Sequence, residues 1–548
     1  MVRKGLVYLL VGFLLSGCQM KKESVDLLIK DARIYTVDED FTIVDALVID
    51  KGKIVDRGST RAMERKYEAR NVIALPDHFV YPGWNDAHCH FTGYGLSLNE
   101  VNLTGTESVE EILGKCNDFV SDNNPDWITG RGWDQNDWDN KSFPHKSMLD
   151  QFFPDLPVML KRVDGHAAWV NSKALEIAEI DASTVVEGGD VMVEDGEPTG
   201  ILIDNAIDLV AEHIPEPGTS EIASGLLKAQ DNCFAVGLTS VSDAGLATST
   251  VKLIEALQRS GDLKMRINAW LEPSEENFET YIDHGVLQNE LLTINTLKLY
   301  ADGALGSRGA KMIEPYADDP QNSGLYLTDP EELKEYCKRA LENNYQVATH
   351  CIGDAANRTM LEIYSDLLEE GNDRRWRIEH AQIIHPDDFS TFKSYQIVPS
   401  VQPTHATSDM YWAEDRIGKE RMEGAYSYKT LLDQLGWIPN GSDFPVEDIN
   451  PLYGFFAAVA RKDHEGYPEN GFRMEEAMSR EEALRAMTIW AAKASFEEHF
   501  KGSLEVGKLA DLVITQEDIM EIDELAIPEV KVTMTISNGE LVYANSLQ

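Results

Sequence analysis

The sequence predicts an α/β fold in which a barrel of parallel strands carries a small β domain built from both chain ends. Between residues 81 and 500, apolar strand-like runs alternate with helical stretches of roughly a dozen residues, as in repeated βα units. This region is long enough for eight such units with insertions. Residues 25–80 and 501–548 carry short strands and turns instead, which sets both ends apart from the middle.

The two ends share one β-strand texture. The first contains a run from Ala46 to Val55, in which Asp50-Lys51-Gly52-Lys53 predicts a hairpin turn. The second contains similar runs from Gly507 to Ile514 and from Thr533 to Tyr543. We therefore expect the two ends to pair into one small β domain.

Three helical stretches stand out in the middle region, namely 108–120, 220–235 and 330–343. The alternation is interrupted at about residues 97–236, where the acidic, turn-rich stretch 187–199 breaks the rhythm. We expect an insertion into the barrel there. The sequence has no repeat of solenoid length and no low-complexity segment, which argues against an array of repeats.

Composition limits the classes of partner. The chain has 548 residues and a formal net charge of −45, which disfavours nucleic acid and anionic membrane surfaces as partners. The alternative meaning of this charge is simply a heavily solvated surface. Apart from Cys18, five cysteines remain, an odd number without paired spacing. They predict neither a disulfide framework nor a CxxC zinc site.

The N-terminus has the features of an export signal over residues 1–17. Arg3 and Lys4 precede an apolar run, Leu6 to Leu15, that is too short to span a bilayer. The following Ser16-Gly17-Cys18 resembles a bacterial lipobox, in which the peptide is cut before the cysteine and the cysteine is lipidated. The alternative is a buried N-terminal helix with a chance cysteine.

The lipobox resemblance predicts a location. The mature chain would begin at Cys18 and continue through a tether at residues 18–24. A lipid anchor would then be the only link to the bacterial cell envelope. Gln19 is not acidic, which favours the outer membrane, facing the periplasm.

The segment Tyr81-Pro82-Gly83-Trp84-Asn85-Asp86-Ala87-His88-Cys89-His90 has the pattern of a strand. Side chains two apart on a strand share a face, so Asp86, His88 and His90 point one way and Cys89 the other. Two imidazoles at this spacing can hold one metal ion. The alternative is a pair of core histidines with satisfied hydrogen bonds.

Lys298 occupies an unusual place in a later strand-like run. It alternates with Leu297 and Leu299, so its side chain faces away from theirs. A lysine that points into a barrel is costly unless it is paired or neutral, and desolvation beside metals lowers its pKa. A neutral amine can take up carbon dioxide and become a carbamate that bridges two cations. A surface lysine is the alternative.

Further metal-ligand types end three later runs. Gln346 to His350 and Arg377 to His380 each supply one imidazole, and Asp443 stands where the run from Ile438 stops before Pro445. Barrel active sites lie at the carboxyl ends of the strands, so these side chains are expected to meet. For Asp443, a carboxylate that caps a turn is the alternative.

Taken together, these motifs carry a resemblance. The opening segment is similar to the Pro-Gly-x-x-Asp-x-His-x-His motif of the amidohydrolase superfamily. Four later segments resemble the YtcJ-like branch, amidohydrolase family 3, and occur in the expected order: Lys298 to Arg308, His350 to Asp354, Glu379 to Gln382 and Gly441 to Pro445. The resemblance implies a distorted (β/α)8 TIM barrel with a composite β-sandwich domain.

The resemblance also implies a ligand set for two divalent metal ions. His88 and His90 would bind the first ion with Asp443, N6-carboxylated Lys298 would bridge, and a second pair of imidazoles would complete the centre: His350 and His380. Neutral imidazoles and carboxylates suit zinc, with manganese, iron and cobalt as alternatives.

The implied activity is hydrolysis of a non-peptide carbon–nitrogen bond in a small molecule, of the amide or N-substituted formamide type. A hydroxide that bridges the metals would attack the carbonyl, and Asp443 would act as general base and then as general acid. His166, Trp133 and Arg308 are the candidates for substrate binding, with loop scaffolding as the alternative for each.

Two other classes of function stay open. The same fold and metals could serve a lactone, ester or phosphoester hydrolase or a lyase, since fold does not determine the bond. A lipid-anchored, non-catalytic binding protein would be expected to lack a metal ligand, and all six are present. The sequence leaves a homo-oligomer open.

Overall fold

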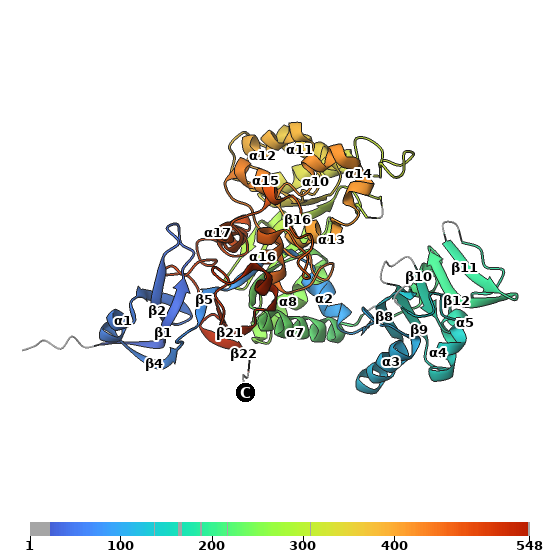
Figure 1. The fold of residues 1–548 in the computed structure, drawn as a ribbon, viewed down its shortest axis with the longest axis horizontal. Helices are drawn as coiled ribbons and strands as arrows, with labels where there is room; N and C mark the ends of the chain where they lie inside the picture. Colours follow the sequence, from blue (N-terminus) through green and yellow to red (C-terminus); the bar gives the residue numbers. More distant parts are fainter. Residues whose placement is uncertain are drawn as a thin grey trace, which may run out of the picture.

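The structure is a computed structural model that describes residues 22–545, apart from residues 136–137, 163–166, 187–188, 216 and 307. The predicted export signal and Cys18 lie outside the described residues. No helix in the described part of the chain combines the length and the apolar character needed to cross a membrane. Three sheets follow one another along the long axis of the molecule (Figure 1).

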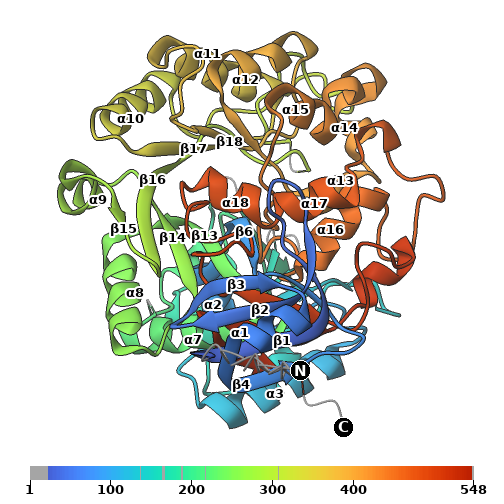
Figure 2. The ribbon, with the colours of Figure 1, turned by 90° about the vertical axis from the view of Figure 1, so that its left-hand side faces the viewer.

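Seven parallel strands form a nearly closed barrel in the middle of the molecule. Every neighbouring pair in this barrel is parallel. Figure 2 shows these strands with helices around their outer side. In their order around the barrel, the strands are β6 (Trp84–Cys89), β13 (Leu238–Leu246), β14 (Arg266–Leu271), β16 (Leu292–Tyr300), β17 (Gln346–Cys351), β18 (Arg377–His380) and β19 (Val398–Ser400).

An irregular segment fills the eighth position, between β19 and β6. Asn440 forms a parallel bridge with Val401, and its carbonyl accepts a hydrogen bond from the amide of Ala87 at 3.2 Å. The amide of Asp443 donates to the carbonyl of His88 at 2.8 Å. The segment thus closes the barrel without forming a regular strand. This confirms the predicted distorted barrel.

Apolar side chains pack between the strands and the outer helices. Helix α10 begins with Pro330 at its first turn, and the side chain of Asp329 accepts the amide hydrogen of Glu331, so the sequence itself starts the helix. The helices around the barrel are α2 (Phe91–Ser97), α7 (Thr219–Ala235), α8 (Thr248–Ser260), α9 (Glu275–Thr280), α10 (Pro330–Glu342), α11 (Asp354–Leu367), α12 (Phe389–Tyr395), α13 (Pro403–Asp409), α14 (Ala413–Arg421), α15 (Tyr428–Leu435), α16 (Pro451–Ala460), α17 (Arg480–Ala486) and α18 (Ile489–Ala494).

Both chain ends contribute to one eight-stranded sheet, as predicted. Its strands in order are β22 (Glu540–Ala544), β21 (Val532–Ser537), β20 (Leu512–Thr515), β5 (Phe79–Pro82), β1 (Glu23–Tyr35), β2 (Ile43–Asp50) and β3 (Lys53–Gly58), and β4 (Tyr67–Ala74) pairs with β1. The β5–β20 pair is antiparallel and joins the two ends. Helix α1 (Thr60–Lys66) connects β3 to β4.

The predicted hairpin turn connects β2 to β3. Asp50 faces Lys53, and both Lys51 and Gly52 have positive φ angles, of 51° and 76°. A two-residue turn of this kind favours glycine at its second position. A Cβ on Gly52 would also lie 2.4 Å from the side chain of Asn538, so close packing of the two chain ends requires glycine there.

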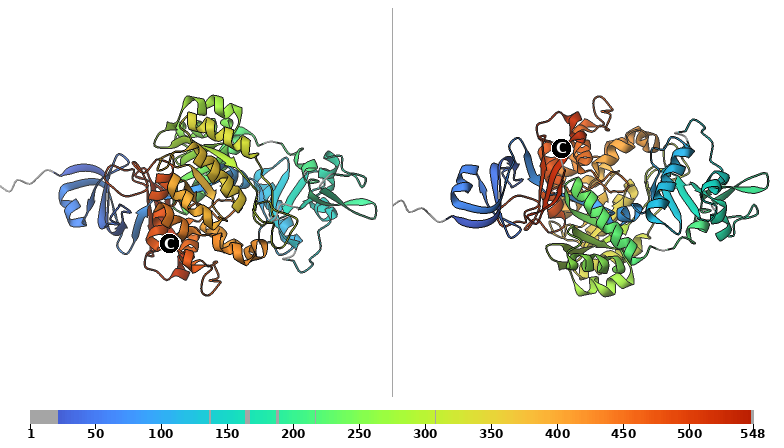
Figure 3. Two further views of the ribbon diagram at one scale, coloured as in Figure 1. Left: turned by 90° about the horizontal axis from the view of Figure 1, so that it is seen from above. Right: turned by 90° about the horizontal axis from the view of Figure 1, so that it is seen from below.

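A six-stranded sheet is formed by the part of the chain between β6 and β13, the next strand of the barrel. Figure 3 shows this sheet and the β1–β4 layer at opposite ends of the barrel. Three buried tryptophans lie in its core, namely Trp133, Trp138 and Trp169. The strands in order are β11 (Gly189–Glu194), β12 (Glu197–Asp204), β10 (Ala167–Val170), β9 (Val158–Arg162), β8 (Ile128–Trp133) and β7 (Val101–Asn102), with helices α3 (Val109–Asn123), α4 (Lys146–Phe152), α5 (Ser172–Ile177) and α6 (Asp208–Ala211).

Candidate metal centre

The structure brings the six predicted ligand residues together at the carboxyl ends of the barrel strands. Side chains at this end of parallel strands meet because each chain turns there toward the next helix. The six residues come from five positions around the barrel: His88 and His90 at the end of β6, Lys298 in β16, His350 in β17, His380 in β18 and Asp443 in the eighth position.

His88, His90 and Asp443 form the tightest group. Oδ1 of Asp443 lies 3.4 Å from Nε2 of His88 and 3.3 Å from Nε2 of His90. Ligands that surround a divalent ion tetrahedrally at about 2.0–2.2 Å lie about 3.3–3.6 Å from one another. The three atoms therefore have the spacing of ligands to one ion, and they form one of the groups able to hold a metal.

Three buried atoms near this group have no hydrogen-bond partner among the described residues. They are Nε2 of His350, Nδ1 of His380 and Oδ1 of Asp443. The rings of His350 and His380 lie 4.6 Å apart, and the ring of His380 lies 5.0 Å from that of His88. Leaving a buried polar atom unpaired costs about 1–3 kcal/mol. Metal coordination would satisfy all three atoms, so the residues fit divalent ions.

Lys298 is fully buried within the cluster. Its Nζ lies 3.3 Å from Nε2 of His88 and faces the rings of Trp270 and Tyr300, at 5.9 and 4.9 Å from their centroids. Burial lowers the pKa of Lys298 to about 8, although the carboxylates of Glu379 and Asp443 oppose this shift. Part of the amine is therefore uncharged near neutral pH.

The protonation states favour metal binding. Burial holds the pKa of His88 and of His380 well below the ordinary value, and burial beside Lys298 lowers the pKa of His350 to about 3. Burial alone would raise the pKa of Asp443, but contact with several imidazoles holds it well below the ordinary value. The imidazoles of His88, His350 and His380 are thus neutral, and the carboxylate of Asp443 is ionised.

Two of these residues hold strained backbone conformations. His380 has a φ of 70° and Asp443 a φ of 63°. Non-glycine residues rarely adopt this region, where aspartate and histidine are among the more tolerated, and such conformations often mark functional sites. The strained backbone turns these side chains toward the other ligands at the strand ends.

A carboxylate that the sequence motifs left without a role lies behind His88. Oε2 of Glu379 is 2.5 Å from Nδ1 of His88, and Oε1 is 2.6 Å from Nε of Arg377. The guanidinium of Arg377 also lies over Trp270, 4.4 Å from its centroid. With Nδ1 hydrogen-bonded to Glu379, Nε2 of His88 is the atom left to bind a metal.

A fifth imidazole reaches the same group from α13. Nε2 of His405 lies 3.4 Å from Oδ2 of Asp443, and its Nδ1 lies 3.0 Å from Oε1 of Glu447. The sequence motifs gave His405 no role. Burial would lower its pKa, but the carboxylates of Asp443 and Glu447 raise it to about 10. With His380 and Asp443, His405 forms a second group of potential ligands.

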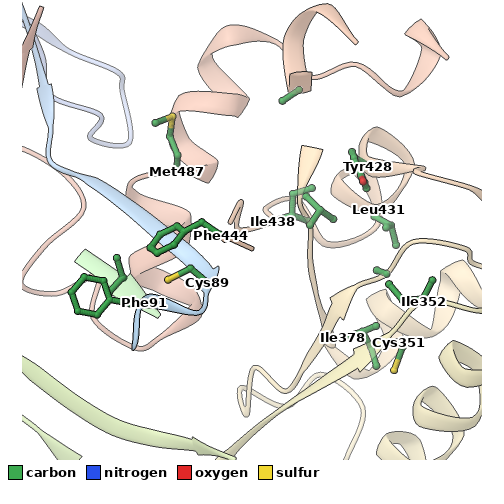
Figure 4. Packing of buried hydrophobic residues seen from close by; sticks show 14 of the residues in the cluster. Cys89, Phe91, Cys351, Ile352, Ile378, Tyr428, Leu431, Ile438, Phe444 and Met487 are labelled. Carbon is green, nitrogen blue, oxygen red and sulfur yellow. The ribbon is translucent and has the colours of Figure 1, made fainter. Parts of the chain in front are cut away.

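The alternation of strand residues explains how a ligand strand also supports the fold. Cys89 points away from His88 and His90, and Figure 4 shows it beside Phe91 and Phe444 in the apolar packing. On the next ligand strands, Cys351 and Ile378 face the same apolar layer (Figure 4). The period of two in the sequence was therefore the signal for the ligand face on β6 and β17. On β18, His380 lies two residues after Ile378, and its positive φ of 70° breaks the alternation.

Comparison with known proteins identifies the family. A model of the amidohydrolase family matches residues 71–543. The chain belongs to this family. The amidohydrolase is 31% identical over 525 residues to YtcJ of Bacillus subtilis (strain 168), which is named as an amidohydrolase. That match covers 94% of this chain and 98% of the relative.

Two further matches bear on the chemistry of the amidohydrolase. The N-substituted formamide deformylase of Arthrobacter pascens is 25% identical over 546 residues, which is 94% of this chain and 98% of the relative. A solved metal-dependent hydrolase of Pyrococcus horikoshii OT3, described as uncharacterized, has a TM-score of 0.78 at 28% identity and covers 91% of this chain and 99% of its own. The chain is a metal-dependent hydrolase that uses divalent metal, and its family indicates a small-molecule substrate.

The three predicted substrate residues of the amidohydrolase lie in different places. His166 lies outside the described residues. Trp133 is fully buried in the core of the six-stranded insertion, where its indole NH donates to the carbonyl of Leu160 at 2.7 Å. Arg308 forms two hydrogen bonds to Asp318, at 3.0 and 2.8 Å.

Proposed function

We propose that the chain hydrolyses a non-peptide carbon–nitrogen bond of a small molecule, of the amide or N-substituted formamide type. The observation that carries this proposal is the convergence of unpaired imidazole and carboxylate atoms at the carboxyl ends of the barrel strands. The similarity over nearly the whole chain to an N-substituted formamide deformylase supports the bond type.

We assign the ligands as two groups that share Lys298. His88, His90 and Asp443 would hold one ion, and the imidazoles of His350 and His380 would hold the second. Neutral imidazole and carboxylate donors suit zinc best among common divalent ions. When bound, such ions lower the pKa of water and polarise a carbonyl oxygen.

Lys298 would join the two groups after reaction with carbon dioxide. The uncharged Nζ forms a bond to the carbon of carbon dioxide and releases one proton, which gives an N6-carboxylate with two oxygens. A pKa lowered to about 8 supports this reaction, because part of the amine is uncharged near neutral pH. The apolar rings of Trp270 and Tyr300 beside Nζ restrict access of water.

Asp443 would move the proton during the reaction. Its carboxylate accepts a proton from the attacking water and then donates it to the departing nitrogen, as general base and general acid. The low pKa of Asp443 supports the first role, since the group starts ionised. The side chain is nearly buried, so the proton is held away from bulk water.

We further propose that Cys18 is lipidated after removal of residues 1–17 and anchors the enzyme to a bacterial envelope membrane, with the outer membrane preferred. The basic start, the apolar run and Ser16-Gly17 support this proposal. The Cys18→Ser variant is expected to lose radiolabelled-palmitate incorporation and to leave the membrane fraction. Unchanged incorporation in the variant would remove the proposal.

The first test is metal content. Elemental analysis of the purified protein should find about two divalent ions per chain, and Lys298→Ala should lose at least half of them. Mass spectrometry of the native protein should show the added mass of one carboxyl group on Lys298. A content of one ion or none that Lys298→Ala leaves unchanged, and that added zinc does not raise, would rule out the shared centre.

The second test is a substrate panel that contains N-substituted formamides, other amides, lactones, esters and phosphoesters. We expect kcat/KM to be highest for a carbon–nitrogen substrate and to be restored by zinc after chelation. Turnover confined to lactones, esters or phosphoesters would contradict the proposed bond while leaving the metal centre in place. Absence of turnover across the panel by metal-loaded protein would favour a binding protein.

A further inference from the structure

The imidazole of His405 lies between two carboxylates. Its Nδ1 is 3.0 Å from Oε1 of Glu447, and its Nε2 is 3.4 Å from Oδ2 of Asp443. Glu447 is itself held in place by the hydroxyl of Ser408, which donates to the same Oε1 at 2.7 Å. Both ring nitrogens therefore face an acceptor oxygen, an arrangement that favours a hydrogen on each nitrogen.

The distance from His405 to Asp443 is compatible with two roles for His405, as a metal ligand or as a hydrogen-bond donor to Asp443. A separation of 3.4 Å is long for a hydrogen bond and equals the separation of His88 from the same carboxylate. The imidazoles of His88 and His405 differ in the groups that surround them. Nε2 of His88 lies 3.3 Å from Nζ of Lys298, so it faces a cationic side chain as well as the carboxylate. The two nitrogens of His405 instead face carboxylate oxygens, at 3.4 Å from Asp443 and 3.0 Å from Glu447.

The two oxygens of Asp443 face different partners. Oδ1 faces His88 and His90, and it is the oxygen without a hydrogen-bond partner among the described residues. Oδ2 faces His405. A donor on Oδ2 fixes the rotation of the carboxylate and leaves Oδ1 directed at the two imidazoles.

We infer that His405 is a positioning residue of the metal centre: held by Glu447, it donates Nε2–H to Oδ2 of Asp443 and thereby presents Oδ1 alone to the metal. This inference rests on the metal-dependent function proposed above. It assigns His405 no contact with a metal ion and no part in bond cleavage. Glu447 supports the role by fixing the ring from its far side, as carboxylates behind metal-centre residues commonly do.

Two substitutions of His405 separate donation to Asp443 from donation to Glu447. The amide nitrogen of glutamine reaches about as far as Nε2 of histidine, and that of asparagine about as far as Nδ1. His405→Gln therefore retains a donor for Asp443, whereas His405→Asn retains a donor only for Glu447. The measurements are the affinity of the full chain for Zn²⁺, the number of ions bound at saturation, and the visible absorption of the Co²⁺-loaded protein.

We expect His405→Asn to bind Zn²⁺ about 10- to 100-fold more weakly, the usual effect of losing a group that orients a metal ligand. The number of ions at saturation should stay unchanged, and the Co²⁺ absorption should shift. His405→Gln should stay within a few-fold of the parent affinity. As a matched control, His385→Gln changes an imidazole that lies 3.7 Å from Asp387, and it should bind as the parent does.

Each other outcome overturns the inference. Loss of about one bound ion per chain in both variants would make His405 a ligand. An equal loss of Zn²⁺ affinity in both variants, or the parent affinity in both, would contradict a specific hydrogen bond from His405 to Asp443. These measurements use no substrate. They therefore test the role of His405 even if the enzyme is found not to hydrolyse a carbon–nitrogen bond. A parent chain that binds no Zn²⁺ would overturn the inference together with the proposed centre.

Discussion

Within the described part of the chain, the barrel and the six-stranded insertion differ in the kind of buried polar atom that has no hydrogen-bond partner. In the barrel, buried atoms of His350, His380 and Asp443 have no partner among the described residues. In the core of the insertion, the indole NH groups of Trp133 and Trp138 donate to backbone carbonyls at 2.7 and 3.1 Å, whereas the indole NH of Trp169 has no partner among the described residues. Unpaired buried atoms cost stability unless a ligand satisfies them. The three unpaired barrel atoms are imidazole and carboxylate atoms that can bind a metal, whereas an indole NH can only donate a hydrogen bond. The difference assigns the chemistry to the barrel and a packing role to the core of the insertion.

The largest expected effect comes from Asp443→Asn in the barrel. The amide keeps the shape but loses the charge and the proton acceptor, so kcat should fall on the order of 10³-fold, equivalent to several kcal/mol of transition-state stabilisation. The matched control is Asp150→Asn in the insertion, whose carboxylate accepts hydrogen bonds from Ser172. A comparable loss of kcat in both variants would contradict the assignment of catalysis to the barrel alone.

The next effect concerns the support of a ligand. Glu379→Gln removes the charge that holds Nδ1 of His88, and it leaves the buried guanidinium of Arg377 without its carboxylate. We expect metal affinity to fall about 10- to 100-fold, measured by competition with a chelator. Glu476→Gln is the control, because that buried carboxylate instead binds Thr430. Equal metal affinity in both variants would show that Glu379 does not orient His88.

A smaller effect is expected in the insertion. Trp133→Phe removes the hydrogen bond to Leu160 and leaves a void in the apolar core. The free energy of unfolding should fall by about 1–3 kcal/mol, measured by chemical denaturation, while the metal content stays at the parent value. A rise in KM without loss of stability would instead assign Trp133 to substrate binding.

The smallest effect on stability is expected for Arg308→Gln at the partly exposed pair with Asp318. Such pairs contribute less than about 1 kcal/mol, so the melting temperature should hardly change. If Arg308 contacts substrate, as the sequence predicts, KM should rise while kcat stays the same, since only ground-state binding is lost. Unchanged KM would leave Arg308 with its contact to Asp318 alone.

Much of the architecture was predictable because local sequence signals agree with the fold. The helices expected at 220–235 and 330–343 occur at Thr219–Ala235 and Pro330–Glu342, since both have apolar periodicity and the second also has a side-chain cap from Asp329. The alternation of Lys298 with Leu297 and Leu299 indicated that the lysine faces inward, and it is fully buried. Alternation along one strand shows which side chains share a face of the sheet, even when the neighbouring strand is not known.

Contacts between distant segments were beyond the sequence. Nothing in the run from Ile438 to Asp443 showed that it closes the barrel as an irregular segment, because the bridge from Asn440 to Val401 is a tertiary contact. Glu379 gave no signal of its support for His88, which is 291 residues away. The acidic environment of His405 likewise depends on Asp443 and Glu447, which reach it only in the folded chain.

The antiparallel pairing of β5 with β20 sets an order of events during synthesis. Pro82 pairs with Leu512, so about 430 residues must be added before β5 can pair with β20, whereas β1, its other neighbour, precedes it in the chain. At roughly 5–20 residues per second, the edge of β5 stays unpaired for about 20–90 s. An open sheet edge is a site for wrong pairing with other chains. The edge of β5 that faces β20 must therefore be protected from other chains during that time. A chain truncated before Leu512 lacks β20, so this edge has no strand to pair with.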